Sequence, residues 1–381
     1  MYRAYKFRLY PTGEQRKKIN ENFGCSIFVY NYYLSFMKKN GVRNKFENIK
    51  DYTHNLQHEY PFLRESDSCL IQKTLFHLDE NFRMFFKSGF GYPKFKSKFD
   101  RSSYTTNAIY STYKDRHYCN IEVDIPNRRI KLPKLKWVNI RGYRNLDEIK
   151  GKIVNATISR DKNGKYYVSV VYEVSIPMKM NKPTRVVGLD VGIKTLVTLS
   201  DGFSIENDRY LIKYEKRIKR LQRELSRKVK RSNNFYKCKR RLAILYSKLS
   251  NARKYYLHKI TKTITDTYDI ITTEKLHTQS MIKTSTSKSL TKNILDSTFR
   301  EIIRQIENKS KLKGKYFYQV DRYYPSSQIC SRCGHRDESY KDIRKRVYEC
   351  GKCQNEIDRD LNASINIAFE GVTKYMREAY N

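Results

Sequence analysis

Four cysteines near the C-terminal end have the spacing of a metal site. Cys330-Ser-Arg-Cys333 and Cys350-Gly-Lys-Cys353 form two CxxC pairs that are sixteen residues apart. Each pair can place two thiolates on one tight turn, and two such turns complete a tetrahedral zinc shell. Gly334 and Gly351 lie where such turns favour glycine. Because four thiolates close the shell, we expect a structural Zn²⁺; two separate redox pairs are the alternative.

Three segments place acidic residues beside apolar ones, at a strand end or a helix start. Asp190 lies in VVGLDVG, Glu274 ends IITTE, and Asp358 and Asp360 open the final helix in IDRDLNASINIA. Carboxylate oxygens are the ligands that Mg²⁺ prefers. Two such ions, held by three or four acids, can activate water and stabilise the leaving oxygen in phosphodiester hydrolysis.

Each acidic position also has a simpler interpretation. A strand-end Asp often belongs to a turn or a helix cap, and Asp358 is a typical N-cap residue. Asn362 and Asn366, later in the same segment, could simply satisfy backbone groups. The order of the acids, their strand placement and the basic surroundings together favour catalysis.

The elements around these acids follow a recognisable order. Apolar runs predict three strands within 185–192, 194–200 and 202–207, followed by two long basic helices over about 210–262 with a turn near 232–234. A fourth strand is expected at 269–276 and a fifth at 315–320. Between them Leu295, Phe299, Ile302, Ile303 and Ile306 line one face of a helix. This order resembles the ribonuclease H fold.

The N-terminal half combines helices with short strands. Residues 2–10 predict a strand, and helical patterning follows to about residue 87, with a break near Tyr60-Pro61 and a clear helix over about 69–86. Strands are expected at 121–125, 129–132, 154–159 and 166–174. We expect these strands to form a β-rich barrel or sandwich.

The charge of the chain points to a polyanionic partner. Lys and Arg number 78 against 39 Asp and Glu, a formal net charge of +39, and 32 Tyr and 18 Phe are interleaved with them. Such a composition suits phosphate contacts and base stacking. We expect no membrane span and no disulfide framework, and therefore a reduced protein in the cytoplasm, associated with the nucleoid of a prokaryote.

Several motifs, in this order, resemble the TnpB family. They are YKFRLYPTGEQ, FVYNYYL, GYPKFKSKF, IKLPKLKW, GLDVGIKTLVTLSDG, IITTEKL, PSSQICSRCG, YECGKC and DRDLNASINIA. The resemblance covers nearly the whole chain. TnpB proteins are transposon-encoded, RNA-guided DNA endonucleases similar to the compact type V CRISPR effectors.

The resemblance implies a mixed α/β and all-β multidomain fold. Its expected parts are the first strand of a wedge domain (1–10), a helical recognition domain (11–89), a wedge β-barrel domain (90–183), an RNase H-like RuvC nuclease domain (184–325 and 358–381) and an inserted zinc ribbon (326–357).

The resemblance also implies a site and partners. By motif, the catalytic and magnesium-binding acids would be Asp190, Glu274 and Asp360, with Asp358 the uncertain neighbour. The partners would be a guide RNA from the transposon end and double-stranded target DNA beside a short adjacent motif. The protein would be a monomer in the RNA complex. Base pairing would supply sequence specificity and the protein would read the motif.

Two further residues, Gln72 and Thr105, match places where the family approaches the adjacent duplex. Ser68 shares a polar helix face with Gln72 and is the third expected nucleic-acid-binding residue. Gln can pair with adenine in the major groove, whereas a surface Gln on an amphipathic helix is the alternative. Two other functions stay open for the whole protein: a transposase proper that joins strands, and a nuclease-inactive RNA-guided DNA-binding regulator.

Overall fold

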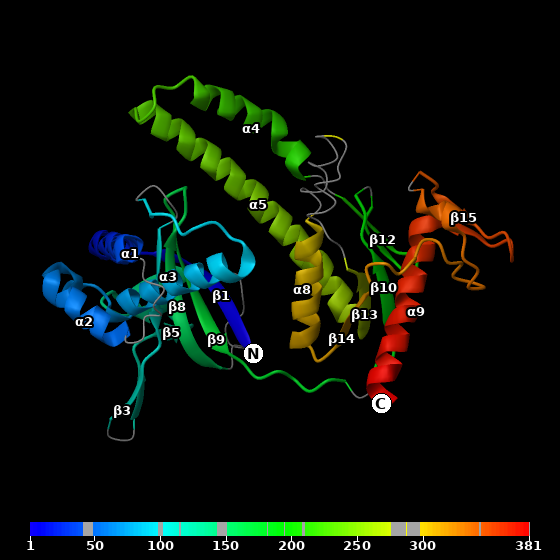
Figure 1. The fold of residues 1–381 in the computed structure, drawn as a ribbon, viewed down its shortest axis with the longest axis horizontal. Helices are drawn as coiled ribbons and strands as arrows, with labels where there is room; N and C mark the ends of the chain where they lie inside the picture. Colours follow the sequence, from blue (N-terminus) through cyan, green and yellow to red (C-terminus); the bar gives the residue numbers. More distant parts are fainter. Residues whose placement is uncertain are drawn as a thin grey trace. The chain divides into compact units, whose positions relative to one another are not determined.

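The structure is a computed structural model. It describes residues 1–40, 49–97, 102–113, 116–142, 151–180, 182–193, 195–207, 210–275, 287, 298–342 and 344–380. The chain divides into two compact units, Met1–Ser175 and Ile176–Asn381 (Figure 1). Every helix in the described part of the chain is too short or too polar to cross a bilayer.

A seven-stranded antiparallel sheet forms the centre of the first unit. Its strands run in the order β2-β8-β9-β1-β7-β6-β5. Their bounds are β1 (Tyr2–Tyr10), β2 (Ser103–Asn107), β5 (Glu122–Asp124), β6 (Arg129–Leu132), β7 (Lys136–Arg141), β8 (Lys152–Arg160) and β9 (Tyr166–Glu173). A separate hairpin joins β3 (Tyr110–Tyr113) to β4 (Arg116–Cys119). Because β1 pairs with both β9 and β7, the first residues of the chain lie in the middle of this sheet.

Helices pack against this sheet through apolar faces. They are α1 (Gly13–Asn40), α2 (Ile49–Glu59) and α3 (Ser68–Ser88), with a short 3₁₀ helix at Pro61–Glu65. The expected break near Tyr60-Pro61 is confirmed. Leu34 of α1 and Leu75 of α3 are buried in one core with sheet residues such as Val168.

The sequence predicted β1, β5, β6, β8 and β9 but missed four other strands of this unit. The β2 segment, SYTTN, carries no aliphatic residue, so it lacks the alternation that marks a half-buried strand. Apart from the β3–β4 hairpin, the other seven described strands of this unit form one sheet, and no pairing between β2 and β5 closes it into a barrel within the described residues.

The second unit contains a five-stranded mixed sheet in the order β12-β11-β10-β13-β14. The strands are β10 (Val186–Asp190), β11 (Thr195–Leu199), β12 (Ser204–Glu206), β13 (Ile270–Glu274) and β14 (Tyr316–Val320), each within or beside its predicted range. β10, β13 and β14 are parallel, whereas β11 and β12 are antiparallel to their neighbours.

Two long helices connect β12 to β13, as the sequence predicted. α4 (Tyr210–Ser226) and α5 (Asn233–Thr267) fold back on each other as a hairpin, which Figure 1 shows in green. The hydroxyl of Ser232 accepts a hydrogen bond from the backbone N–H of Phe235 and caps α5. α8 (Phe299–Leu312) then leads to β14. Leu295, expected on the same helix face, lies outside the described residues.

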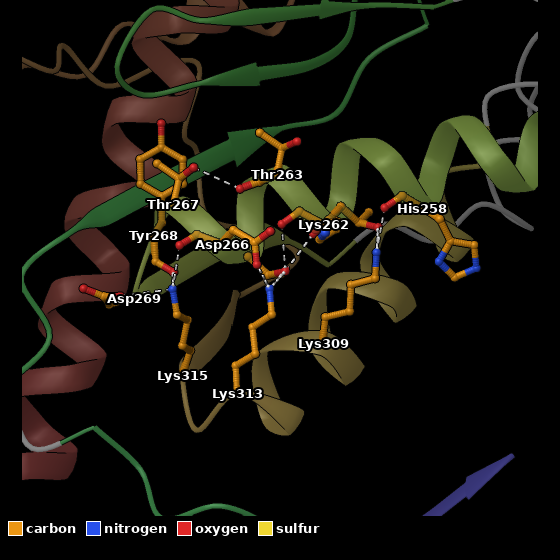
Figure 2. Close-up of polar contacts among 12 residues, drawn as sticks. His258, Lys262, Thr263, Asp266, Thr267, Tyr268, Asp269, Lys309, Lys313 and Lys315 are labelled. Carbon is orange, nitrogen blue, oxygen red and sulfur yellow. Dashed lines mark hydrogen bonds and ion pairs between the residues drawn. The ribbon is translucent and has the colours of Figure 1, made fainter. Parts of the chain in front are cut away.

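Three lysines, one in α8 and two in the turn between α8 and β14, contact the last third of α5 and the residues just after it (Figure 2). Lys309 donates to the carbonyl of His258, and Lys315 donates to the carbonyls of Asp266 and Tyr268. Lys313 donates to the hydroxyl of Thr265 and pairs with the Asp266 carboxylate. Cations at a helix C-terminus satisfy its free carbonyls and its partial negative charge. These contacts fix the start of β13, which follows α5 directly.

The last part of the chain contains a small ribbon and a long helix. β15 (Val347–Glu349) and β16 (Glu356–Asp358) pair antiparallel, and α9 (Arg359–Tyr380) follows at once. α9 packs against the five-stranded sheet. The element that carries the final acids is therefore part of the same unit as β10 and β13.

Candidate functional site

The four cysteines of the two CxxC pairs converge. Their sulfur atoms all lie within 4.8 Å of one another. Cys330 and Cys353 have Sγ atoms 3.7 Å apart, and those of Cys333 and Cys350 are 3.5 Å apart. Zn–S bonds of about 2.3 Å in a tetrahedron place sulfurs about 3.8 Å apart. The donor set and its spacing therefore fit one Zn²⁺.

The two turns that carry these cysteines have the same backbone form. The N–H of Gly334 donates to the carbonyl of Cys330, and the N–H of Gln354 donates to that of Cys350, each at 2.9 Å. Both donors have a left-handed backbone, with φ of 74° and 55°. The expectation for Gly334 is met, but that for Gly351 is wrong, because Gln354 takes the left-handed position of the second turn.

Strand pairing brings Asp190 and Glu274 to one edge of the sheet. β10 and β13 are parallel, with Leu189 opposite Thr273, so each strand ends one residue later in an acid. Successive side chains of a strand point to opposite faces. Val187 and Leu189 pack into the core with α5 and α8. Asp190 therefore points to the other face.

That other face is covered by α9 at very close range. A Cβ on Gly188 would lie 2.0 Å from the carbonyl oxygen of Ser364, and one on Gly371 would lie 1.8 Å from the Thr272 hydroxyl oxygen. Glu274 has the same parity as Thr272, so it too points toward the α9 face. Close approach through two glycines brings the first turn of α9, with Asp360, to the ends of β10 and β13.

The charges of Glu274 and Asp360 act on Asp190. Burial, together with the charges of Glu274 and Asp360, raises the pKa of Asp190 to about 8. Burial also raises the pKa of Glu274, against a hydrogen bond from Ser326 and the charge of Arg359, which lower it. Like charges held together in this way are costly unless cations compensate them. The carboxylate donor set thus fits hard divalent cations.

Asp358 and Asp360 have different surroundings. Oδ1 of Asp358 accepts hydrogen bonds from the backbone N–H groups of Asp360 and Leu361 and so caps α9. The Asp360 carboxylate acts on Asp190 and has a guanidinium nitrogen of Arg346 at 3.8 Å. The simpler interpretation, an N-cap, therefore applies to Asp358.

The acids do not converge as tightly as the cysteines. Within the described residues, the four thiols are the one group of three or more possible ligands that meets around a single point. Two ions in one site lie about 3.5–4 Å apart, so acids that share a pair need not meet at one point.

Two residues at this site were not singled out from the sequence. Ser326 donates its hydroxyl hydrogen to Glu274 Oε1 at 2.5 Å. Arg359 is buried, its charge lowers the pKa of both Asp190 and Glu274, and its Nε has no hydrogen-bond partner among the described residues. The motifs PSSQ and DRD contain them, but nothing in their spacing indicates where the side chains point.

Asn362 and Asn366 have the structural role that the sequence left open. The side-chain amides of both donate to the carbonyl of Ile329, and Asn366 also donates to that of Ser326. Asn362 Oδ1 accepts from the N–H of Ser331. These contacts hold the start of the ribbon on α9.

Ser68, Gln72 and Thr105 lie on two elements that pack together, α3 and β2. Ser68 is exposed and Gln72 partly exposed, one helical turn apart. The hydroxyl of Thr105 is 2.9 Å from that of Thr157, and Thr105 is buried. The first two residues are accessible to a ligand, whereas the Thr105 hydroxyl already has a partner.

The α4 helix and the two residues that follow it carry a cationic surface, called here the cationic surface of α4. An open cavity of about 670 Å³ is lined by Lys216, Lys219, Arg220, Arg223, Glu224, Arg227 and Lys228. Six of these seven residues are basic. A surface of this kind attracts phosphate groups.

Three family models match the sequence. A helix-turn-helix domain model of the OrfB IS605 group matches residues 1–45, the model described as "Probable transposase" of the same group matches residues 169–285, and the Cas12f1-like TNB domain model matches residues 299–367. The last of these contains all four cysteines.

Two curated proteins are similar over most of their length. The chain is 30% identical to "Putative RNA-guided DNA endonuclease InsQ" of Escherichia coli (strain K12), over 97% of this chain and 92% of that protein. It is 31% identical to "Putative RNA-guided DNA endonuclease" of Streptomyces pristinaespiralis, over 97% and 89%.

A solved structure has a similar fold. The protein in "Cryo-EM structure of the Cas12f1-sgRNA-target DNA complex" aligns with a TM-score of 0.60 at 16% identity, over 97% of this chain and 98% of that one. The chain thus has a mixed α/β multidomain fold of the Cas12f type, with a RuvC-type OrfB domain and a four-cysteine zinc-finger region.

Proposed function

The chain belongs to the TnpB family, the OrfB proteins of IS605-type elements. From this membership we propose that it is an RNA-guided DNA endonuclease that works as follows. It binds a guide RNA from the transposon end and double-stranded target DNA beside a short motif. It cleaves that DNA at a magnesium-dependent site formed by Asp190, Glu274 and Asp360.

One observation carries the proposed site. Burial is the main cause that raises the pKa of Asp190 to about 8, and Glu274 and Asp360, from two distant segments, lie close enough for their charges to add to it. A fold that only needed stability would gain by replacing such a charge cluster. The cluster is explained when divalent cations bind it and compensate the charge.

The residues then have separate roles. Asp190, Glu274 and Asp360 would hold magnesium ions, which supply an activated water and stabilise the leaving oxygen when bound. Asp358 keeps the first turn of α9 in place by capping it. The cysteine site takes no part in the chemistry, because a shell of four thiolates leaves no open position.

We assign the domains as the sequence suggested. The wedge domain is the β-rich domain formed by 1–10 and 90–183, and the pairing of β1 with β7 and β9 supports joining these two segments. Residues 11–89 are the recognition domain, 184–325 and 358–381 the RuvC domain, and 326–357 the ribbon.

The first unit reads the adjacent motif through Gln72 and Ser68 on α3, together with Thr105 on the neighbouring strand β2. A cleavage library screened with Gln72→Ala tests this, since an unchanged motif preference would contradict it.

The decisive experiment compares cleavage with binding. The protein is purified with its flanking transcript, and plasmid cleavage and target binding are measured in Mg²⁺. Asp190→Ala, Glu274→Ala and Asp360→Ala should each abolish cleavage and leave target binding nearly unchanged. Asp358→Asn, which keeps an N-cap oxygen, is the matched control and should retain cleavage.

Other outcomes would identify other functions. Equal loss of binding and cleavage in the three alanine variants would show that the acids are structural. Guide-independent strand transfer would indicate a transposase proper. Guide-dependent binding without nicking in the unmodified protein would indicate a nuclease-inactive regulator.

A further inference from the structure

Ser326, the first residue of the zinc ribbon, forms a hydrogen bond with one of the proposed catalytic acids, Glu274. Its side chain is buried, and its hydroxyl donates to Glu274 Oε1 at 2.5 Å. Hydrogen bonds from a hydroxyl to a carboxylate are short and about twice as strong as neutral ones. This bond engages one carboxylate oxygen of Glu274.

The backbone of Ser326 is held just as firmly. Its carbonyl accepts from the Asn366 side-chain amide at 2.8 Å, and its N–H donates to the carbonyl of Tyr324 at 2.9 Å. Asn366 is 4% exposed and lies on α9, the helix that begins with Asp360 in its first turn. Ser326 therefore cannot shift independently of α9.

The next residues extend the same connection into the ribbon. Asn362 and Asn366 of α9 both donate to the carbonyl of Ile329, directly before the first zinc ligand, Cys330. Ser327 Oγ accepts from the Arg359 guanidinium at 3.4 Å. One short segment thus contacts β13, α9 and the cysteine site.

A glutamate has three rotatable side-chain bonds, and fixing them costs conformational entropy. A carboxylate that is held before a metal ion arrives does not incur that cost on binding. Because the Ser326 hydroxyl engages Oε1, the remaining lone pairs of Glu274 are directed elsewhere. A purely structural serine would only need to fill space or satisfy its own hydroxyl.

We propose that Ser326 is a positioning residue for Glu274: its hydroxyl orients the carboxylate for metal binding and couples it, through Asn366, to the helix that carries Asp360. The inference rests on the proposed function, since it assigns a role toward the metal ions of that site. Ser326 itself touches neither substrate nor metal.

The test measures metal binding separately from cleavage. Zinc-loaded protein is titrated with Mn²⁺ by calorimetry for the unmodified chain, Ser326→Ala, Ser326→Thr and the control Ser310→Ala. Ser310 is a fully buried serine of α8 whose hydroxyl oxygen has no hydrogen-bond partner among the described residues. Single-turnover cleavage by the guide complex is measured at several Mg²⁺ concentrations.

We expect Ser326→Ala to weaken Mn²⁺ binding and slow cleavage by about 10- to 100-fold, the usual effect of removing a hydrogen-bond partner of a metal ligand. Target binding should not change, added Mg²⁺ should recover part of the rate, and Ser326→Thr should restore most of both properties. Ser310→Ala should match the unmodified protein. If Ser326→Ala does not fold, Ser326→Cys replaces it, because a thiol is a weaker donor of similar size.

Two results would overturn the proposal. In one, Ser326→Ala binds Mn²⁺ as tightly as the unmodified protein, whatever happens to cleavage. In the other, Ser326→Thr is as defective as Ser326→Ala. Failure of the acidic site itself is separate: it would appear as unchanged Mn²⁺ binding in Glu274→Gln.

Discussion

Asp190 is the residue at which function and stability conflict most directly. It ends a buried strand, shares a face with Glu274 and lies near Asp360, and its pKa is raised to about 8. An unfolded aspartate has a pKa of about 3.9. In the absence of metal, Asp190 therefore binds a proton in the folded chain but not in the unfolded chain between about pH 4 and pH 8, and its contribution to stability falls as pH rises through that window.

Asp190→Asn should remove this loss of folding stability at high pH. Without divalent ions we expect the variant to be more stable than the unmodified protein at pH 8, by about 1–3 kcal/mol, and the difference should shrink toward pH 4. Mg²⁺ should raise the unfolding temperature of the unmodified protein and leave that of Asp190→Asn unchanged. Calorimetric unfolding at several pH values measures both effects.

The control for this experiment is Glu356→Gln, which changes an exposed acid of the ribbon. It should follow the unmodified protein at every pH and respond to Mg²⁺ in the same way. If Asp190→Asn were no more stable than the unmodified chain at pH 8, the charged form of Asp190 would not be destabilised in the folded protein.

At the scale of elements, the distance between α9 and the sheet decides whether the acids meet. Gly188 faces the backbone of α9, and Gly371 of α9 faces Thr272 of β13. Backbone atoms cannot rotate away as a flexible side chain can. Any side chain at Gly188 must therefore push the whole helix outward, and Asp360 with it.

Gly188→Ala should destabilise the protein by about 1–3 kcal/mol or more, because the new Cβ would lie 2.0 Å from the Ser364 carbonyl oxygen and 2.5 Å from the Ala368 nitrogen. Cleavage should fall as well, since Asp360 is displaced. The matched control is Gly351→Ala, where a Cβ would meet nothing within 4 Å. Denaturant unfolding and plasmid cleavage distinguish the two variants; equal stability would contradict the close packing.

At the scale of the whole molecule, charge is the dominant property. A net charge of +39 causes self-repulsion, which a nucleic acid partner relieves. The cationic surface of α4 concentrates that charge on one element. It includes Arg220 and Arg223, both exposed.

Arg220→Gln with Arg223→Gln should weaken guide RNA binding. The slope of log affinity against log salt should also become shallower, by about 1 for each phosphate that the protein no longer neutralises. The control is Arg129→Gln with Lys131→Gln, two cations of β6 that are ion-paired with Asp124 and Glu122. Filter binding over a range of salt concentrations gives both slopes. The same slope for both double variants would exclude α4 from the interface.

Local sequence patterns predicted much of the secondary structure. Apolar runs located all five strands of the mixed sheet in the second unit, though not β15 and β16, and helical spacing with Pro61 located α3 and the break before it. The search for apolar patterns missed β2, whose SYTTN segment forms a strand through its pairing with β8 rather than through an apolar pattern of its own. The prediction that Gly351 takes the special position in the second cysteine turn was wrong for a related reason. Backbone geometry rather than residue type placed Gln354 in the left-handed position.

The zinc site and the basic character follow from the sequence alone, because a CxxC turn is local and charge is a sum over residues. The meeting of Asp190, Glu274 and Asp360 does not. It depends on the parallel register of β10 with β13, on the parity that points both strand-end acids toward one face, and on the two glycines that let α9 approach. Ser326 and Arg359 are equally hidden in the sequence, since side-chain direction is set by packing between segments far apart in the chain.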